Sequence, residues 1–117
     1  MAAMGERWVY YLARKGEFER ARDGDRYLGS AEDRADGFIH FSTASQVRGS
    51  AAKHRKGETD LLLLEVDAEL LGAGLRWEPA RGGELFPHLY AALPLDAIRR
   101  TAPLPLAGDA HLFPDWV

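Results

Sequence analysis

The segment DLLLLEVD, residues 60–67, has the pattern of a strand at the centre of a core. Four consecutive leucines precede Glu65 and Val66, so apolar residues do not alternate with polar ones. A short apolar run of this kind is typical of a strand that is buried on both faces. We therefore predict a central strand at residues 60–67, with other elements covering both of its sides.

Further strands are predicted before and after this one. Segments rich in β-branched, aromatic or alternating apolar residues lie at residues 8–13, 38–42, 75–80, 89–93 and 96–106. Pro87 has no amide hydrogen for a sheet ladder, so it predicts an edge, a turn or a bulge before the fourth of these segments. Leu112, Phe113 and Trp116 make the tail, residues 107–117, apolar enough to dock on the body of the protein.

Helices are predicted in two places. Residues 14–24 suit a short amphipathic helix that Gly24 ends, and a second helix is expected to begin within residues 42–44 and to run to Arg55. Ser42 or Thr43 would be its N-cap, because a hydroxyl can accept a hydrogen bond from a free amide in the first turn. The polar segment at residues 25–37 is expected to be a loop. Because strands outnumber helices and do not alternate with them, the predicted class is α+β.

The composition indicates one ordinary globular domain covering residues 1–117. The absence of cysteine excludes disulfides, thiolate metal sites and cysteine nucleophiles. The longest apolar run is too short to cross a bilayer, and the amino-terminal residues lack the pattern of a secretory signal. We therefore expect a cytoplasmic protein with no membrane partner.

The net charge of −3 does not indicate a nucleic-acid-binding protein. A basic segment at residues 48–56 is the local exception, with Arg48, Lys53, Arg55 and Lys56 close together. Two interpretations of this segment remain open. It is either a solvated helix face or a surface that contacts RNA.

His40 stands in the middle of an apolar run, at the junction between a predicted strand and a predicted helix. Strand alternation places Phe38, His40 and Ser42 on one face. A histidine in a strand is often a structural interior residue. Here, however, the neighbouring hydroxyls and the helix terminus would suit a phosphate or a ribose.

A second group of polar residues lies in RWEPARGGELFPHLY, residues 76–90. Acidic, basic and aromatic side chains surround a Gly-Gly pair, and such loops are favoured places for functional sites. The alternative is structural: Arg81 and Glu84 would form an exposed pair, Trp77 would belong to the core, and His88 would bond a backbone carbonyl.

Two other kinds of site are not supported by the sequence. The four histidines lack metal-binding spacings such as HxH or HExxH, so no metal is expected. Ser42 is not flanked by the glycines of a nucleophile elbow, which argues against a serine hydrolase.

In their order and spacing, GFIHFSTASQV, DLLLLEVD and LRWEPARGGELFPHLY resemble the bacterial and plant family catalogued as domain of unknown function 952. The resemblance spans residues 8–98 and is carried above all by the His-x-Ser-Thr and Phe-Pro-His-Leu-Tyr motifs. Members of that family are similar in fold to the ADP-ribosyltransferase-like group. This implies a single compact domain with a split, strand-rich core, one or two short helices, and a cleft that binds NAD in active relatives.

The resemblance also implies roles for individual residues. His40 would contact a ribose, His88 would face the same cleft from a later strand, and Tyr90 would stack beside it. A pair of histidines is closer to the RNA phosphotransferase branch of the group than to the branch with a catalytic glutamate. The chain departs from the pattern of the second branch, because no carboxylate matches that catalytic glutamate. Glu78 and Glu84 are the only candidates near His88 in the sequence. In addition, an alanine follows the tyrosine where the family usually has glycine.

Two functions of different classes follow. The first is an enzyme that binds NAD or a related nucleotide and transfers an ADP-ribosyl or phosphoryl group. His40 and His88 would be catalytic, and the ligand-binding residues would be Ser42, Thr43, Trp77, Arg81 and Tyr90.

The second function is a non-catalytic module that recognises a small metabolite or a partner through the same cleft. For either function, the expected partner is a small molecule or a nucleotide, with an RNA end as a further candidate. A carboxylate facing His40 would favour catalysis, and its absence would favour binding alone. A third class, an accessory protein without a ligand, predicts both histidines buried and bonded to backbone.

Overall fold

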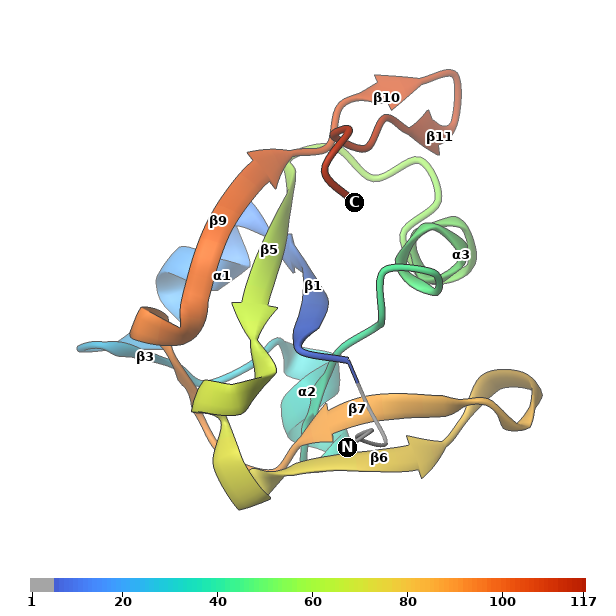
Figure 1. Cartoon of the computed structure of the whole chain (residues 1–117). Helices are drawn as coiled ribbons and strands as arrows, with labels where there is room; N and C mark the ends of the chain where they lie inside the picture. Colours follow the sequence, from blue (N-terminus) through green and yellow to red (C-terminus); the bar gives the residue numbers. More distant parts are fainter. Residues whose placement is uncertain (1–5) are drawn as a thin grey trace.

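The computed structural model describes residues 6–117, and its centre is an antiparallel sheet of three strands. In spatial order these are β1 (Trp8–Arg14), β5 (Leu61–Asp67) and β9 (Ile98–Pro103) (Figure 1). Leu64 and Val66 of β5 belong to one buried cluster, whereas Leu61 and Leu63 belong to another. The prediction of a central strand buried on both faces is therefore confirmed.

A second antiparallel sheet carries the residues of interest for function. Its strands, in spatial order, are β4 (Ile39–His40), β7 (Leu85–Leu89) and β6 (Leu75–Pro79). The β6–β7 hairpin extends beneath the helix α3 (Val47–His54) in Figure 1. The two sheets are joined where Tyr10 and Ser42 exchange backbone hydrogen bonds of 2.8 and 2.9 Å.

Short elements complete the α+β domain. They are the helices α1 (Lys15–Arg20) and α2 (Ala31–Asp36), the strands β2 (Arg22–Asp23), β3 (Arg26–Tyr27), β8 (Leu93–Pro94), β10 (Leu106–Ala107) and β11 (Ala110–His111), and the 3₁₀ turns η1 (Ala68–Leu70), η2 (Gly72–Gly74), η3 (Arg81–Gly83) and η4 (Leu95–Ala97). With α3, the described residues contain three α-helices, where one or two were expected. None of the helices within residues 6–117 is long and apolar enough to span a membrane.

The predictions for residues 14–37 were wrong in two respects. The first helix ends at Arg20, and Gly24, with φ of 65°, lies in the turn between β2 and β3. The expected loop at residues 25–37 contains β3 and the helix α2. That helix begins with a capping box, in which Ser30 and Asp33 each bind the other's backbone amide.

The second predicted helix begins later than expected. It starts at Val47, with Gln46 as an N-cap that makes no side-chain capping bond, so neither Ser42 nor Thr43 caps it. The backbone of Ser42 is engaged by Tyr10, which keeps the chain extended beyond β4. The Ser42 hydroxyl is also engaged, with the Ser50 hydroxyl at 2.8 Å.

Pro87 lies within β7, the middle strand of its sheet, and not at an edge or before a strand. The two-residue strand β4 pairs with β7 only at His88 and Leu89. On the side of β7 that faces β4, Pro87 contributes only its carbonyl oxygen to the pairing. This oxygen accepts a hydrogen bond of 2.9 Å from the Phe41 amide. The missing amide hydrogen of proline is therefore tolerated here.

The carboxyl-terminal segment follows the β10–β11 hairpin. Phe113 and Trp116 pack against the buried cluster that contains Leu61 and Leu63. Leu112 does not contribute to this packing, since it is 53% exposed.

A matched pair of leucines tests the central role of β5. Leu64→Ala removes a fully buried side chain, so we expect the free energy of unfolding to fall by about 2–5 kcal/mol. Leu70→Ala truncates a side chain that is 60% exposed and should change it by no more than about 0.5 kcal/mol. Urea unfolding of both variants measures the difference, and equal losses would show that β5 is not the centre of the core.

Candidate functional site

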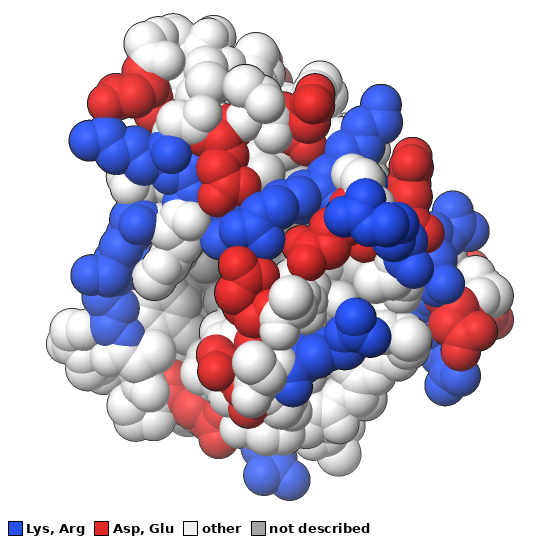
Figure 2. All heavy atoms as spheres, turned by 180° about the vertical axis from the view of Figure 1, so that it is seen from behind, with Lys and Arg blue, Asp and Glu red and all other residues white. Residues whose placement is uncertain are grey.

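A cleft of about 700 Å³ lies between α2, α3, β1, the β4–β7 pair and the turn η3. Its apolar lining includes Tyr10, Tyr11, Phe41 and Phe86, whereas its polar lining includes histidines and charged residues of both signs. Figure 2 shows basic and acidic side chains around a hollow on the left of this face. The cleft thus offers an aromatic surface and charged groups to one ligand.

His40 and His88 line this cleft together. They are direct partners in the register between β4 and β7, and their ring centroids lie 5.8 Å apart in an edge-to-face arrangement. Two residues that are far apart in sequence are therefore held side by side by the backbone ladder. The sequence-based expectation that both histidines face one cleft is confirmed.

His40 is bound by two carboxylates. Its Nδ1 lies 2.6 Å from Asp33 Oδ1, and its Nε2 lies 2.9 Å from Asp36 Oδ2. Asp33 is buried, and it also accepts hydrogen bonds from the Tyr11 hydroxyl and from the backbone amides of Ser30 and His40. Neither aspartate was predicted as a site residue, because both fall in the segment expected to be a loop.

The electrostatics favour a charged pair of His40 and Asp33. Burial acts to lower the pKa of His40, but hydrogen bonds and the charges of Asp33 and Asp36 outweigh it and raise this pKa above its ordinary value. Burial acts to raise the pKa of Asp33, yet hydrogen bonds from His40, Tyr11 and the backbone leave it lowered. Each shift favours the charged form of its own group, imidazolium for His40 and carboxylate for Asp33.

His88 is oriented by a different carboxylate. Its Nδ1 lies 2.7 Å from Glu78 Oε1, and the Tyr90 hydroxyl donates to the same oxygen at 2.7 Å. The bonds from Tyr90 and His88 lower the pKa of Glu78, so this carboxylate is an acceptor. His88 therefore donates from Nδ1, and its Nε2 makes no hydrogen bond within the described part of the chain.

Phe38 holds the aromatic residues of the site together. Its ring centroid lies 4.1 Å from that of His88, 4.5 Å from that of His40 and 5.2 Å from that of Tyr90. Strand alternation correctly placed Phe38 and His40 on one face. Phe38 stacks on His88 and packs at a tilt against His40, so one ring contacts both imidazoles.

The other predicted site residues are divided between the cleft and its surroundings. Ser42 and Arg81 line the cleft. Thr43 is buried beside Ser45, and Trp77 packs against the main core. Tyr90 lies outside the lining but contacts Glu78 and Phe38.

Glu78 and Glu84, the two carboxylates predicted for the site, lie in different surroundings. Glu78 orients His88, as described above. Glu84 is away from both histidines, where Gln46 Nε2 lies 3.4 Å from its Oε1.

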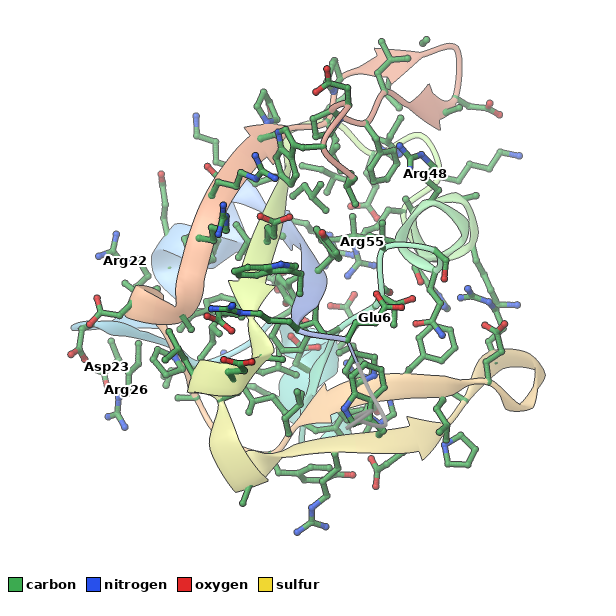
Figure 3. All side chains as sticks on the ribbon, viewed as in Figure 1. Glu6, Arg22, Asp23, Arg26, Arg48 and Arg55 are labelled. Carbon is green, nitrogen blue, oxygen red and sulfur yellow. The ribbon has the colours of Figure 1, made fainter. Side chains whose placement is uncertain are left out.

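The basic segment at residues 48–56 is split between two surfaces. Lys53, His54 and Arg55 line the cleft. Arg48 instead donates to the Val117 backbone oxygen at 2.7 Å, and Lys56 pairs with Asp109 at 3.5 Å. Figure 3 shows Arg55 between α3 and β1, whereas Arg48 lies beside the carboxyl-terminal tail. Within residues 6–117, no group of three or more histidine, aspartate or glutamate side chains is arranged to hold a metal ion.

The chain is similar to proteins whose structures are known. The family model described as a protein of unknown function, DUF952, matches residues 12–101. The crystal structure of protein CC0527 from Caulobacter crescentus is 43% identical, with a TM-score of 0.83 over 89% of this chain and 91% of that one. Its solution NMR structure is 42% identical, with a TM-score of 0.77 over 91% of each chain. No protein with a curated description matches significantly.

The carboxylates around His40 predict a measurable titration. We expect the imidazole pKa of His40 to lie above about 6.5 in the native protein. Asp36→Asn should lower it, and Asp33→Asn should lower it further, because Asp33 makes the shorter and more buried contact. NMR titration of the ring protons measures these values in the folded variants.

The same pKa shifts determine how the free energy of unfolding depends on pH. A raised His40 pKa stabilises the fold fully below about pH 6.5, and this contribution is lost as the pH rises through the folded value. The lowered Asp33 pKa stabilises the fold above about pH 4, and this contribution is lost in more acidic solution. A native His40 pKa at or below 6.5 would contradict the ion pair.

Proposed function

We propose that this chain, which belongs to the DUF952 family of proteins of unknown function, binds NAD or a related nucleotide in the cleft and transfers a group from it. One observation carries the proposal: two imidazoles, each bound to a carboxylate, lie 5.8 Å apart in a cleft that also contains Lys53, Arg55 and Arg81. Imidazoles supply an acid and a base, and the cations suit phosphate groups.

The two histidines are suited to different roles. Glu78 fixes His88 in the form whose Nε2 can accept a proton, so His88 is the proposed general base. His40 is the proposed acid, because Asp33 and Asp36 favour its protonated form. Asp36 is largely exposed, so a ligand can displace it from His40 Nε2.

Transfer of a phosphoryl group uses both roles in one step. His88 Nε2 takes the proton of an acceptor hydroxyl or water while that oxygen bonds to phosphorus. The bond from phosphorus to the leaving oxygen breaks, and His40 Nε2 gives its proton to that oxygen. Afterwards His88 carries the proton from the acceptor and the leaving oxygen carries the proton from His40, so protons and electron pairs balance.

Phosphoryl transfer suits the site better than ADP-ribosyl transfer. An oxocarbenium-like transition state needs a carboxylate beside the sugar. Glu78, one of the two expected candidates, is occupied by His88 and Tyr90, and Glu84 lies outside the cleft. The likeness to the ADP-ribosyltransferase-like group is part of this proposal, supported by two small antiparallel sheets that meet at Tyr10 and Ser42.

A non-catalytic binding module is the second candidate. Both ring nitrogens of His40 contact carboxylates, an arrangement that also suits a fixed cation for holding an anionic metabolite. An accessory protein without a ligand is less suited to this geometry. The His40 side chain is 39% exposed, and its ring bonds are to carboxylates and not to backbone.

Substitution of each histidine tests catalysis against binding. With NAD, ADP-ribose, nucleotides and 2′-phosphorylated RNA ends as probes, we expect one of them to raise the melting temperature and to be turned over. His88→Gln should lower kcat by about 10²–10⁴-fold, because it removes the base, while changing the Kd much less. Thermal unfolding, calorimetric titration and product analysis provide the measurements.

His111→Gln is the matched control, because His111 bonds the Glu58 backbone oxygen away from the cleft. Its kcat should equal that of the native protein. Binding without turnover in the native protein would favour the binding module. A set of probes that neither stabilise the protein nor react would contradict the proposed function.

A further inference from the structure

The α3 side of the cleft carries basic groups that take no part in the proton transfers proposed above. Lys53, His54 and Arg55 come from the end of α3, and Arg81 comes from η3 on the β6–β7 hairpin. Among the described residues, none of these four side chains forms a salt bridge with a carboxylate. Among the described residues, the three permanent cations Lys53, Arg55 and Arg81 thus lie in the cleft without a salt-bridge partner.

Arg55 is only partly satisfied by the protein. One terminal nitrogen donates to the His54 backbone oxygen at 3.0 Å, but its Nε is buried and has no hydrogen-bond partner among residues 6–117. A buried donor without a partner is costly, and such groups often belong to a ligand site. The Arg55 side chain lies between α3 and β1 and lines the cleft, so the unpartnered donor belongs to a residue that can contact a bound group (Figure 3).

The acidic residues of the cleft make their hydrogen bonds with other partners. Asp33 and Asp36 bind His40. Glu32 accepts two hydrogen bonds from Arg14, at 3.0 and 3.1 Å, which lower its pKa to about 2. The charge of Arg55 also acts to lower the pKa of Glu32, but none of these carboxylates forms a salt bridge with the four basic side chains in the described part of the chain.

His54 reports this positive environment. Burial is the main cause that lowers its pKa, followed by the charges of Arg81, Arg55, Lys53 and His40. These groups face His54 from η3, from its own helix and from β4. An anion bound among them would offset the repulsion and favour the protonated ring.

We propose that Lys53, His54, Arg55 and Arg81 form a phosphate-binding subsite, separate from the histidine pair, which holds a second phosphate of the ligand. This inference rests on the proposed function and names its substrate class: a nucleotide with a phosphate distant from the group that is transferred. Arg55 supplies the fork of donors, and Lys53 and Arg81 supply charge from two sides.

Binding at this subsite is coupled to proton uptake. The pKa of His54 is low without the anion and rises when it binds, so between the two pKa values the affinity increases as the pH falls. Sulfate is the suitable probe for this effect, because it stays fully ionised over the same pH range. An NMR titration of His54 with and without sulfate should show the rise directly.

Arg55→Gln tests the subsite against a matched surface arginine. We expect it to weaken pyrophosphate and ADP binding at least tenfold and to leave adenosine binding unchanged, as measured by calorimetry. Arg22→Gln removes an arginine from the β2–β3 hairpin, far from the cleft (Figure 3), and should change each Kd less than twofold. Arg55→Lys should retain part of the affinity, and urea unfolding verifies that each variant is folded.

The outcomes separate the subsite from the proposed function. If Arg55→Gln binds pyrophosphate as tightly as the native protein does, or Arg22→Gln loses as much affinity, the subsite is refuted. An unchanged His54 pKa on binding would also refute it. If pyrophosphate binding depends on Arg55 but His88→Gln leaves turnover intact, the subsite stands and the histidine chemistry fails.

Discussion

The buried carboxylate of Asp33 connects most of the elements that form the cleft. It caps its own helix through Ser30, accepts the Tyr11 hydroxyl from β1, and binds both the amide and the ring of His40 on β4. Tyr11 in turn contacts the Tyr27 hydroxyl of β3 at 2.8 Å. A charge that is only 4% exposed requires such partners, so burial of Asp33 is possible only when these elements are assembled around it.

The sequence predicted the central strand and the two histidines better than it predicted their partners. The strand expected at residues 89–93 was wrong, because β7 ends at Leu89 and β8 begins only at Leu93. The apolar run at residues 60–67 has one plausible location, and alternation around His40 assigns that residue a face. The capping pattern of Ser30 and Asp33 was present in the sequence, but the polar composition around it favoured a loop. That Asp33 binds His40 follows from the tertiary arrangement of α2 against β4, which local patterns do not encode.

The helix α3 shows how tertiary contacts displace a local signal. Hydroxyl residues at 42 and 43 are good caps by intrinsic preference. The backbone of Ser42 is instead used to join the two sheets, and the helix can begin only after the chain has turned at residues 44–46. Lys53 and Arg55 stand at the carboxyl-terminal end of this helix, where both line the cleft.

The placement of both histidines on one sheet has a mechanical consequence. Their separation is set by adjacent positions on β4 and β7, whereas Tyr10 belongs to the other sheet and Arg55 to a helix. Opening or closing of the cleft would therefore change the room available to a ligand without altering the distance between the two rings. The two rings thus keep a constant separation whatever the width of the cleft.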